Sequence, residues 1–441
     1  MRGVGIVSEK RGFEIDDVSC SVSAIDRLSV VRAVVESYYS FTSLFTPTSP
    51  AEGVVPAVPV PSTVSSPPVE TPLRRIRVAL VAARYLPFVG GIELHVHEVA
   101  RRLARSGADV TILTTDPSGG LPRRESVDGV EVRRVRAWPA ERDYYVAPGI
   151  YRELAEGPFD LVHVQGYQTF VAPIALLAAE RRRLPTVLTF HGGGHSSRLR
   201  QAIRPLQIAT LRPLLARADR LVTLAPFERD EYARRLRLPP ERFAVIPNGS
   251  DLPAAAAVDV RREAGRIASL GRLERYKGHH LVLAALPHLL ARRPDARLWI
   301  GGHGPEEEAL RRLAHELGVA DQVEIRGIAP GDREAMAREL ARVDTVVSLS
   351  EFETQPIAAL EALSLGCKLV VAAAPGLAAL AASGLAAAVP PGAPPEAVAD
   401  AIVEALARAP AAEPPALPSW DACADGLLAL YRDVLSRRGA R

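Results

Sequence analysis

Two basic side chains on one loop carry the clearest chemical signal in this sequence. Arg272 and Lys277 lie in the segment Leu270–Gly278, directly after a short apolar run. A guanidinium and an ammonium group that converge from one loop can neutralise a diphosphate, the first through a planar set of donors and the second as a point charge. The chain contains only three lysines, so we interpret Lys277 as a functional residue rather than as a solvated surface charge.

Two glutamates form the second signal. Glu353 and Glu361 stand eight positions apart after another apolar run. If Pro356 opens a helix, Glu361 lies more than one turn inside it and Glu353 lies on the loop before it. Two carboxylates at different depths of one pocket can bind two sets of sugar hydroxyls, and the helix N-terminus between them can receive a phosphate. An exposed, charged helix start is the alternative, but the alanines and leucines around Glu361 disfavour it.

Glycine-rich turns mark further points at which the backbone can approach a ligand. Gly90 and Gly91 lie between an apolar run and an amphipathic segment, where the N-terminus of the following helix would offer free N–H groups to an anion. An ordinary strand-to-helix turn would explain one of these glycines equally well. Gly302 and Gly304 follow the next strand after the Arg272 loop, and we expect them to form a backbone wall of the same pocket.

A histidine and a lone asparagine complete the set of candidates. His191 ends an apolar run and precedes three glycines, which would place it at the edge of a sheet that faces a cleft. There it could hydrogen-bond a sugar hydroxyl or a phosphate. A satisfied core histidine is an equally good interpretation. Asn248, the only asparagine of the chain, lies in an Asn-Gly turn between the two halves of the sequence.

The apolar runs that precede these candidates indicate buried parallel strands separated by helices. The expected strands of the first half are Arg77–Ala83, Asp109–Thr114, Leu161–Val164, Thr186–Phe190 and Arg220–Leu224. Those of the second half are Arg266–Leu270, Arg297–Gly301, Gln322–Ile325, Thr345–Leu349 and Lys368–Ala372. Two such series predict an α/β protein with two facing Rossmann-like domains. Binding sites in these sheets open at the carboxyl ends of the strands, which predicts an interdomain cleft.

The sequence divides into five parts. In chain order they are an appendage of unknown role (1–45), a proline-rich linker (46–75), the N-terminal Rossmann-like domain (76–250), the C-terminal one (251–420) and a helical C-terminus (421–441). The last part continues a helical pattern of apolar residues that begins at Trp420. Proline and alanine also gather at residues 389–418, where we expect an interruption near the end of the second domain.

Composition excludes several classes of protein. Hydrophobic residues make up 48% of the 441-residue chain, which excludes a disordered protein. Three cysteines without a CxxC pair indicate neither a zinc site nor a disulfide framework. No uncharged apolar run is long enough for a transmembrane helix, and charged residues follow the N-terminus too soon for a signal peptide. We therefore expect a cytoplasmic protein.

The net charge of +3 hides an uneven distribution. Residues 76–250 hold 26 basic and 18 acidic side chains, whereas residues 251–441 hold 21 and 25, so the first domain carries +8 and the second −4. Nucleic acid is not indicated. An anionic membrane surface or a phosphorylated acceptor for the first domain is a reasonable hypothesis, and the Arg-rich segment 198–220 is a candidate for peripheral membrane contact. An ordinary helix in an Arg-rich protein is an equally good interpretation.

Taken in order, six motifs resemble one known family. They are Gly90–Glu93, His191–Gly192, Pro247–Asp251, Gly271–Gly278, Gly301–Pro305 and Glu353–Glu361. Each motif is weak alone, but the ordered set is similar to the retaining glycosyltransferases of family 4, which have the GT-B fold. The resemblance implies transfer of a sugar from a nucleotide-diphosphate sugar to a glycan, glycolipid or polyprenyl-linked acceptor, with retention of the anomeric configuration.

The resemblance also implies a role for each candidate. In the second domain the residues that match the donor site are Arg272 and Lys277 at the diphosphate, Glu361 at the ribose, Glu353 facing the sugar, and Gly302, Gly304, Ile357 and Ala358 as further contacts. In the first domain, His191 matches a histidine near the reaction centre, and Gly90 and Gly91 match a loop beside the donor phosphate and the acceptor. The terminal helix would cross back to the first domain. No metal is expected, because two cations can stabilise the leaving diphosphate.

Three departures from the family pattern leave alternatives open. Gln355-Pro356 stands where Phe-Gly is usual, Gly366-Cys367-Lys368 replaces Gly-x-Pro, and the segment after Gly376 lacks a second glycine. Cys367 fits a core position better than a nucleophile. The alternatives are a nucleotide-sugar epimerase or phosphorylase of the same fold, and a non-catalytic relative that binds a sugar or a membrane. The donor base, the sugar, the acceptor and the oligomeric state are not specified by the sequence.

Overall fold

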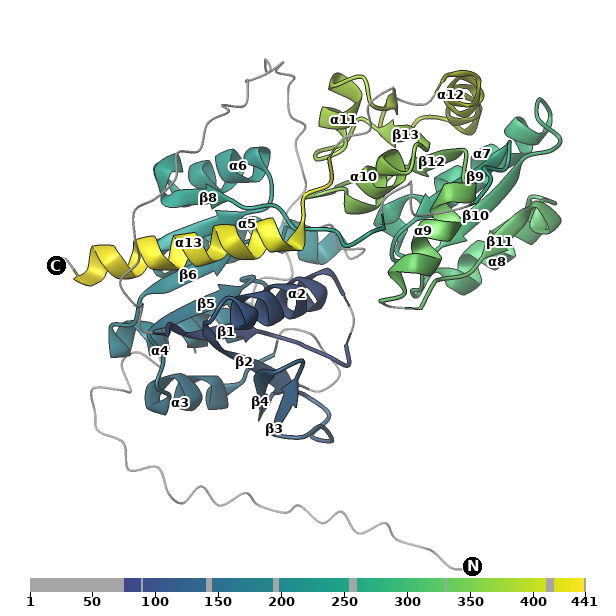
Figure 1. The fold of residues 1–441 in the computed structure, drawn as a ribbon. Helices are drawn as coiled ribbons and strands as arrows, with labels where there is room; N and C mark the ends of the chain where they lie inside the picture. The colour runs from purple at the N-terminus through teal and green to yellow at the C-terminus, as the bar shows by residue number, and fades with distance from the viewer. Residues whose placement is uncertain are drawn as a thin grey trace, which may run out of the picture. The chain divides into compact units, whose positions relative to one another are not determined.

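The computed structural model describes residues 75–88, 90–139, 145–192, 198–253, 260–329, 331–409 and 416–439. The expected appendage and almost all of the proline-rich linker lie outside these residues. Pro72–Arg441 form a single compact unit. This unit contains two sheets, and each sheet with the helices packed on it forms a lobe (Figure 1). We call them lobe 1 and lobe 2 in chain order.

Lobe 1 is built on an eight-stranded sheet with the order β3-β4-β2-β1-β5-β6-β7-β8. Neighbouring strands run parallel, except that β3 and β4 are antiparallel. The strands are β1 (Arg77–Ala82), β2 (Asp109–Asp116), β3 (Arg124–Val127), β4 (Val130–Arg136), β5 (Leu161–Gln165), β6 (Thr186–Thr189), β7 (Arg220–Thr223) and β8 (Phe243–Val245). The central strands are apolar because helices cover both faces of the sheet.

The helices of lobe 1 divide between the two faces of this sheet. They are α2 (Gly91–Arg105), α3 (Pro148–Glu156), α4 (Val171–Arg182), α5 (Arg198–Leu215) and α6 (Pro226–Leu236). Successive residues of a strand point to opposite faces, so β1 contributes to two cores. Val78 and Leu80 pack in the core beneath α2, whereas Ala79 and Val81 pack in the core that α3 to α6 cover.

Lobe 2 contains six parallel strands in the order β11-β10-β9-β12-β13-β14. They are β9 (Arg266–Leu270), β10 (Arg297–Gly301), β11 (Val323–Ile325), β12 (Thr345–Ser348), β13 (Lys368–Ala372) and β14 (Ala387–Val389). Its helices are α7 (His279–Leu290), α8 (Glu307–Glu316), α9 (Arg333–Arg342), α10 (Ile357–Ser364), α11 (Ala378–Ala382) and α12 (Pro395–Ala407). One face carries α7, α8 and α12, and the other carries α9, α10 and α11. The prediction of two Rossmann-like α/β units is confirmed.

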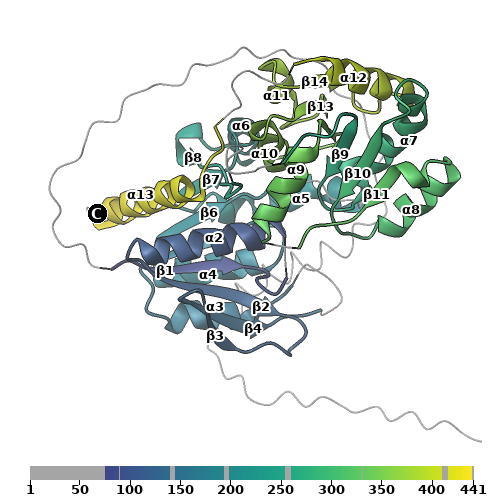
Figure 2. The same ribbon diagram turned by 45° about the vertical axis from the view of Figure 1, so that its right-hand side comes forward.

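The C-terminal helix α13 (Trp420–Gly439) follows lobe 2 in the chain but packs on lobe 1, beside α2 (Figure 2). Its residues Trp420, Leu427 and Tyr431 are buried in the same core as α2 and β1. The Tyr431 hydroxyl lies 2.6 Å from Nδ1 of His163 on β5. The predicted return of this helix to the first lobe is therefore confirmed.

Two elements differ from the expectation. The hairpin β3–β4 was not predicted, because β3 is short and polar. Its turn, Asp128-Gly129, has two positive φ angles of 50° and 80°, as a tight hairpin turn requires. The expected interruption at residues 389–418 is wrong in its middle, where α12 forms. Pro395 stands at the start of that helix, where a proline costs no hydrogen bond, and the alanines after it favour helix.

Candidate functional site

A cavity of about 210 Å³ opens in lobe 2 at the carboxyl ends of β9 and β12. It is lined by Leu270, Gly271, Lys277, Val346, Ser348, Glu353, Gln355, Pro356, Ile357, Ala358 and Ala359. The first turn of α10 forms one wall, so a helix N-terminus lies beside the cavity, where the Ile357 N–H donates to the Gln355 carbonyl at 2.9 Å. The structure therefore brings four predicted residues together here: Lys277, Glu353, Ile357 and Ala358. An anion in this cavity would meet both a helix N-terminus and an ammonium group.

Lys277 and Glu353 form an ion pair inside the cavity. Lys277 Nζ lies 2.6 Å from Oε1 of Glu353, and the Ser350 hydroxyl donates to the same oxygen at 2.8 Å. The two charged side chains are only 15% and 17% exposed. Because each neutralises the other, a diphosphate that enters the cavity would compete with Glu353 for the lysine.

The backbone of Glu353 is held by a close approach to Gly376. The Glu353 N–H donates to the carbonyl of Pro375 at 3.1 Å. Gly376 has φ +83°, and a Cβ atom there would lie 1.8 Å from the Glu353 carbonyl oxygen. Only glycine fits this position. Gly376 therefore allows the Glu353 backbone to lie close to the loop after β13.

Arg272 lies on the same loop as Lys277, one residue beyond the cavity-lining Gly271. Its guanidinium contacts Oε1 of Glu274 at 2.6 Å and donates to the Tyr276 hydroxyl at 3.1 Å. Partial burial lowers the pKa of Arg272, but Tyr276, Glu274 and Glu93 raise it by more. Glu93 belongs to the first turn of α2, so the acidic start of that helix faces the basic loop of lobe 2.

The four predicted glycines meet different steric surroundings. A Cβ at Gly302 would lie 1.9 Å from the Gly271 carbonyl, and one at Gly304 would lie 2.5 Å from the Leu273 carbonyl. Both glycines therefore allow the turn after β10 to pack on the Arg272 loop. A Cβ at Gly90 would lie 2.5 Å from Glu93 Oε2, whereas one at Gly91 would meet nothing within 4 Å. Gly91 thus leaves open space beside the first turn of α2.

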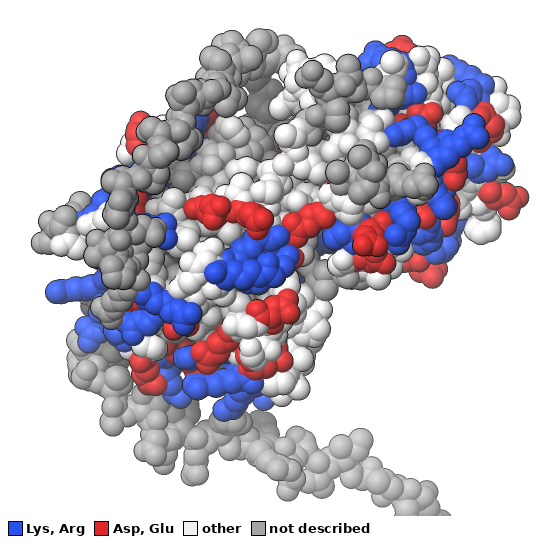
Figure 3. Space-filling view, in the orientation of Figure 1, with Lys and Arg blue, Asp and Glu red and all other residues white. Residues whose placement is uncertain are grey.

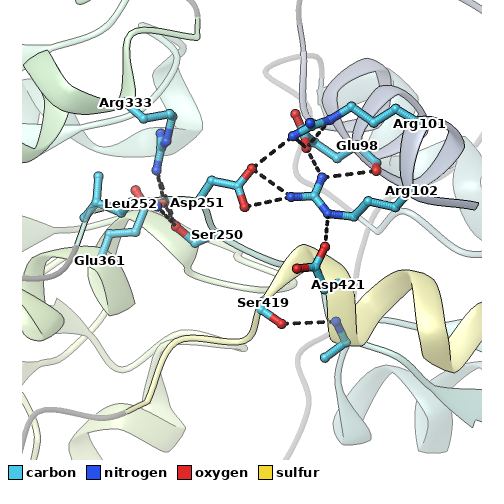
Figure 4. Close-up of polar contacts among 11 residues, drawn as sticks. Glu98, Arg101, Arg102, Ser250, Asp251, Leu252, Arg333, Glu361, Ser419 and Asp421 are labelled. Atoms are coloured by element: carbon cyan, nitrogen blue, oxygen red, sulfur yellow. Dashed lines mark hydrogen bonds and ion pairs between the residues drawn. The ribbon is translucent and has the colours of Figure 1, made fainter. Parts of the chain in front are cut away.

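Glu361 is buried within α10 and held by two partners from other segments (Figure 4). The Ser250 hydroxyl donates to its Oε1 at 2.5 Å, and the Arg333 guanidinium forms an ion pair with the same oxygen. Arg333 opens α9, and Ser250 lies on the segment that joins the lobes. The sequence analysis missed both partners. Ser250 stands in the Asn-Gly turn segment that drew attention, but Arg333 gave no signal.

His191 lies in lobe 1, outside the lining of the lobe 2 cavity. It is 6% exposed, its Nε2 donates to Oε1 of Gln165 at 2.7 Å, and its carbonyl accepts from the Gln168 amide at 2.8 Å. Burial, reinforced by His95 and His163, lowers the pKa of His191 well below its usual value. The imidazole is therefore neutral at physiological pH. Three of the residues that follow it, 193–195, lie outside the described part of the chain.

Glu228, in the first turn of α6, is a buried acid that the sequence analysis missed. It is 1% exposed, and its Oε2 accepts from the Leu224 N–H at 3.0 Å. Burial raises the pKa of Glu228 to about 7, although hydrogen bonds from Leu224, Thr354 and Gly192 oppose the shift. Its position gave no signal, because an acid in the first turn of a helix is ordinary.

Both chain crossings between the lobes are anchored to α2 by ion pairs (Figure 4). The Arg102 guanidinium contacts Oδ1 of Asp251, on the first crossing, at 3.0 Å. It also contacts Oδ1 of Asp421, at the start of α13, at 2.6 Å. Arg101 adds a contact with Asp251 at 3.2 Å, and Glu98 pairs with both arginines. Helix α2 of lobe 1 is thus paired with both segments that join the lobes.

The two described cysteines are free and buried. Burial raises the pKa of both thiols, to about 12 for Cys423. The prediction that Cys367 is a core residue is confirmed. Within the described ranges, no three His, Cys, Asp or Glu side chains form a group suited to a metal ion. None of the helices described here is both long and apolar enough to cross a bilayer.

Comparisons with known proteins agree with this geometry. Residues 89–253 match the family described as Glycosyltransferase Family 4, and residues 257–414 match Glycosyl transferases group 1. The chain is 31% identical over 322 residues to D-inositol 3-phosphate glycosyltransferase 1 of Catenulispora acidiphila, an alignment that covers 65% of this chain and 75% of that protein.

A second relative and a solved structure extend the likeness. The chain is 30% identical over 300 residues to the GDP-mannose:cellobiosyl-diphosphopolyprenol alpha-mannosyltransferase of Xanthomonas oryzae pv. oryzae, covering 66% of this chain and 77% of that protein. The structure of Anabaena Alr3699/HepE in complex with UDP and glucose superposes with a TM-score of 0.57 at 17% identity, over 83% of this chain and 98% of that one. The similarity in structure concerns the fold.

Proposed function

The chain belongs to glycosyltransferase family 4, and we propose how its two lobes divide that family's reaction. It is a glycosyltransferase, an enzyme that moves a sugar from a nucleotide-sugar donor to an acceptor with retention of the anomeric configuration. The observation that supports our assignment of roles is the lobe 2 cavity, where the Lys277–Glu353 pair faces the N-terminus of α10. The epimerase, phosphorylase and non-catalytic alternatives have no comparable support.

The donor is proposed to bind in lobe 2. Its diphosphate would lie at the first turn of α10, against Ile357 and Ala358, with Lys277 and Arg272 as the countercharges. Glu361 would accept hydrogen bonds from the ribose hydroxyls. Glu353, released from Lys277 by the diphosphate, would face the hydroxyls of the sugar. Gly302 and Gly304 shape the loop behind this site.

The reaction depends on stabilising the diphosphate as it leaves. As the glycosyl–phosphate bond breaks, negative charge grows on the leaving phosphate, and in this proposal Lys277, Arg272 and the α10 N–H groups offset it. We propose that the acceptor hydroxyl attacks from the same face of the sugar and that the leaving phosphate takes its proton. The two cations supply the charge that a metal would otherwise supply, so we propose metal-independent transfer.

The acceptor is proposed to bind in lobe 1, near Gly90, Gly91 and His191. The open space beside Gly91 and the free N–H groups at the start of α2 suit a phosphate-bearing acceptor. The relatives named above act on an inositol phosphate and on a diphosphopolyprenol glycan, and the first domain carries a net charge of +8. We therefore propose an acceptor of the glycan or lipid-linked class that contains a phosphate.

We further propose that the protein is cytoplasmic and contacts the membrane surface peripherally. Helix α5 holds the Arg-rich segment, and its Leu206 side chain is 43% exposed. The face drawn in Figure 3 mixes basic and acidic side chains over both lobes, so it is not the basic surface required. Flotation with vesicles that contain or lack phosphatidylglycerol tests the idea. Binding only to the anionic vesicles supports it, and no flotation contradicts it.

The proposed transfer is tested by incubating the protein with a panel of UDP- and GDP-sugars, a phosphorylated polyol and a polyprenyl-diphosphate glycan. Release of nucleoside diphosphate together with a new glycosidic product of unchanged anomeric configuration, read by NMR, is the expected result. A changed sugar without any acceptor would indicate an epimerase, and a need for inorganic phosphate would indicate a phosphorylase. Nucleotide binding without turnover of any donor would contradict the proposal.

A further inference from the structure

The loop that carries Glu353 is attached to lobe 1 by the residues on either side of that glutamate. Before it, the Phe352 ring packs edge-on against Phe227 of α6, with ring centroids 6.3 Å apart and planes at 73°. After it, Thr354 approaches Gly192 so closely that a Cβ there would lie 2.6 Å from the threonine hydroxyl. Glu353 alone turns the other way, to Lys277. The proposed sugar-facing residue therefore stands on a loop that both lobes hold.

Gln355 makes the most specific of these contacts. Its Oε1 accepts from the Asn248 N–H at 2.7 Å, and its Nε2 donates to the Asn248 carbonyl at 2.9 Å. One side chain thus satisfies both backbone groups of a residue on the crossing between the lobes. The phenylalanine usual at this position in the family could make neither bond.

The link continues from Asn248 into the core of lobe 1. Its Oδ1 lies 2.7 Å from Nδ1 of His95, a residue of α2 that is 1% exposed. The His95 ring in turn packs edge-on against the His191 ring, with centroids 4.8 Å apart. The chain contains no second asparagine, and aspartate in its place would bring a buried negative charge beside His95.

We propose that Gln355 is a positioning residue that locks the Glu353 loop to the lobe crossing. Through it, the placement of lobe 1 sets the direction of Glu353 and of the first turn of α10, which begins two residues later. The hydrogen-bonded link itself is given by the distances above. Its consequence for catalysis rests on the proposed function, because it concerns the donor site.

Hydrogen–deuterium exchange tests the link without any substrate. In Gln355→Met, a side chain of similar length without hydrogen-bonding groups, the Asn248 amide loses its acceptor. We expect its exchange to accelerate at least about tenfold, because protection depends on that bond. Gln322→Met is the matched control, since Gln322 lies at the amino-end side of β11, away from the cavity, and should leave Asn248 unchanged. Equal exchange in Gln355→Met and the wild type would overturn the proposal.

Kinetics test the consequence of the link. We expect Gln355→Met to lower kcat for transfer about 10- to 100-fold, because small misplacements of reacting groups have effects of this size. The Kd for UDP or GDP, whichever the wild type binds, should change less than about threefold. An unchanged kcat would overturn the positioning role. So would a variant in which kcat, nucleotide affinity and melting temperature all fall together, because that would indicate a general loss of structure. If the wild type binds neither nucleotide, the proposed function fails, while the exchange experiment still decides whether Gln355 links the lobes.

Discussion

The polar side chains of the two lobes differ in charge: those of lobe 2 are paired ions, and those of lobe 1 are buried groups whose pKa values favour the uncharged form. In lobe 2 the proposed site residues form ion pairs: Lys277 with Glu353, Arg272 with Glu274, and Glu361 with Arg333. In lobe 1, His191, His95 and Glu228 are buried, and burial favours the uncharged form of each. Burial lowers the pKa of His191 well below its usual value, lowers that of His95 to about 4, and raises that of Glu228 to about 7.

This difference indicates how the work is divided. A diphosphate needs countercharges that can exchange partners, and in our proposal the lobe 2 ion pairs supply them. An acceptor hydroxyl needs orientation, and in our proposal the buried hydrogen-bonding groups of lobe 1 supply it. Hydrogen bonds between Gln355 and Asn248 join lobe 2 to the crossing between the lobes, and we propose that they position the donor site.

The largest expected effect follows from removing the central charge of lobe 2. Lys277→Ala should lower kcat/KM for the donor about 10²- to 10³-fold, because loss of one preorganised donor to a developing anion has effects of this size. The assay is initial-rate release of nucleoside diphosphate. Arg275→Ala, in the same turn but on the surface, is the control and should retain wild-type activity. Equal rates for Lys277→Ala and the wild type would remove Lys277 from the site.

The second prediction concerns the buried acid of lobe 1, Glu228. Its pKa is about 7 in the folded protein against a usual 4.5, so folding favours the protonated acid. Its contribution to stability is complete below pH 4.5 and is lost as the pH rises through 7, to a total of about 3 kcal/mol. Glu228→Gln does not titrate but keeps an acceptor for Leu224. Its melting temperature relative to wild type should rise from pH 4.5 to 7.5 and then level off. A difference that is constant across this range would show that Glu228 is ionised throughout.

The ribose and the diphosphate are proposed to use different residues, and binding can separate them. Glu361→Ala should weaken UDP or GDP about 10- to 100-fold by calorimetry, the effect of losing hydrogen bonds to a charged group. It should leave pyrophosphate binding unchanged. Lys277→Ala should weaken both ligands. If Glu361→Ala weakened pyrophosphate as much as the nucleotide, Glu361 would act on phosphate or on the fold rather than on the ribose.

Salt should act on one lobe and spare the other. Raising NaCl from 50 to 500 mM should weaken nucleoside diphosphate binding several-fold, because partly exposed charges are screened. The pH step in stability that we assign to Glu228 should stay in place, because buried groups are screened much less. A shift of that step by salt would mean that Glu228 is open to solvent.

Much of the lobe 2 site could be predicted from the sequence, because its residues lie on short loops directly after strands. Lys277 was informative through the rarity of lysine, and Glu353 and Glu361 through their spacing. The parallel sheets followed from continuous apolar runs. Helix α12 is not evident from the sequence, because proline often interrupts a helix, whereas Pro395 starts this one. Hairpin β3–β4 has a turn signal in Asp128-Gly129, but β3 is short and polar.

The contacts that tie the site together could not be predicted, because each joins residues far apart in the chain. Asn248 and Gln355 are 107 positions apart, and Ser250 and Glu361 are 111 apart. Glu228 is an ordinary first-turn acid until the fold buries it. The roles of His191, Gly90 and Gly91 remain predictions, because they concern an acceptor.

A crystal structure of the protein with bound nucleoside diphosphate tests the central claim most directly. We predict that Lys277 Nζ leaves Glu353 and lies about 3 Å from a phosphate oxygen, at the first turn of α10, with the ribose hydroxyls on Glu361. A diphosphate bound elsewhere, with the Lys277–Glu353 pair intact, would contradict the account.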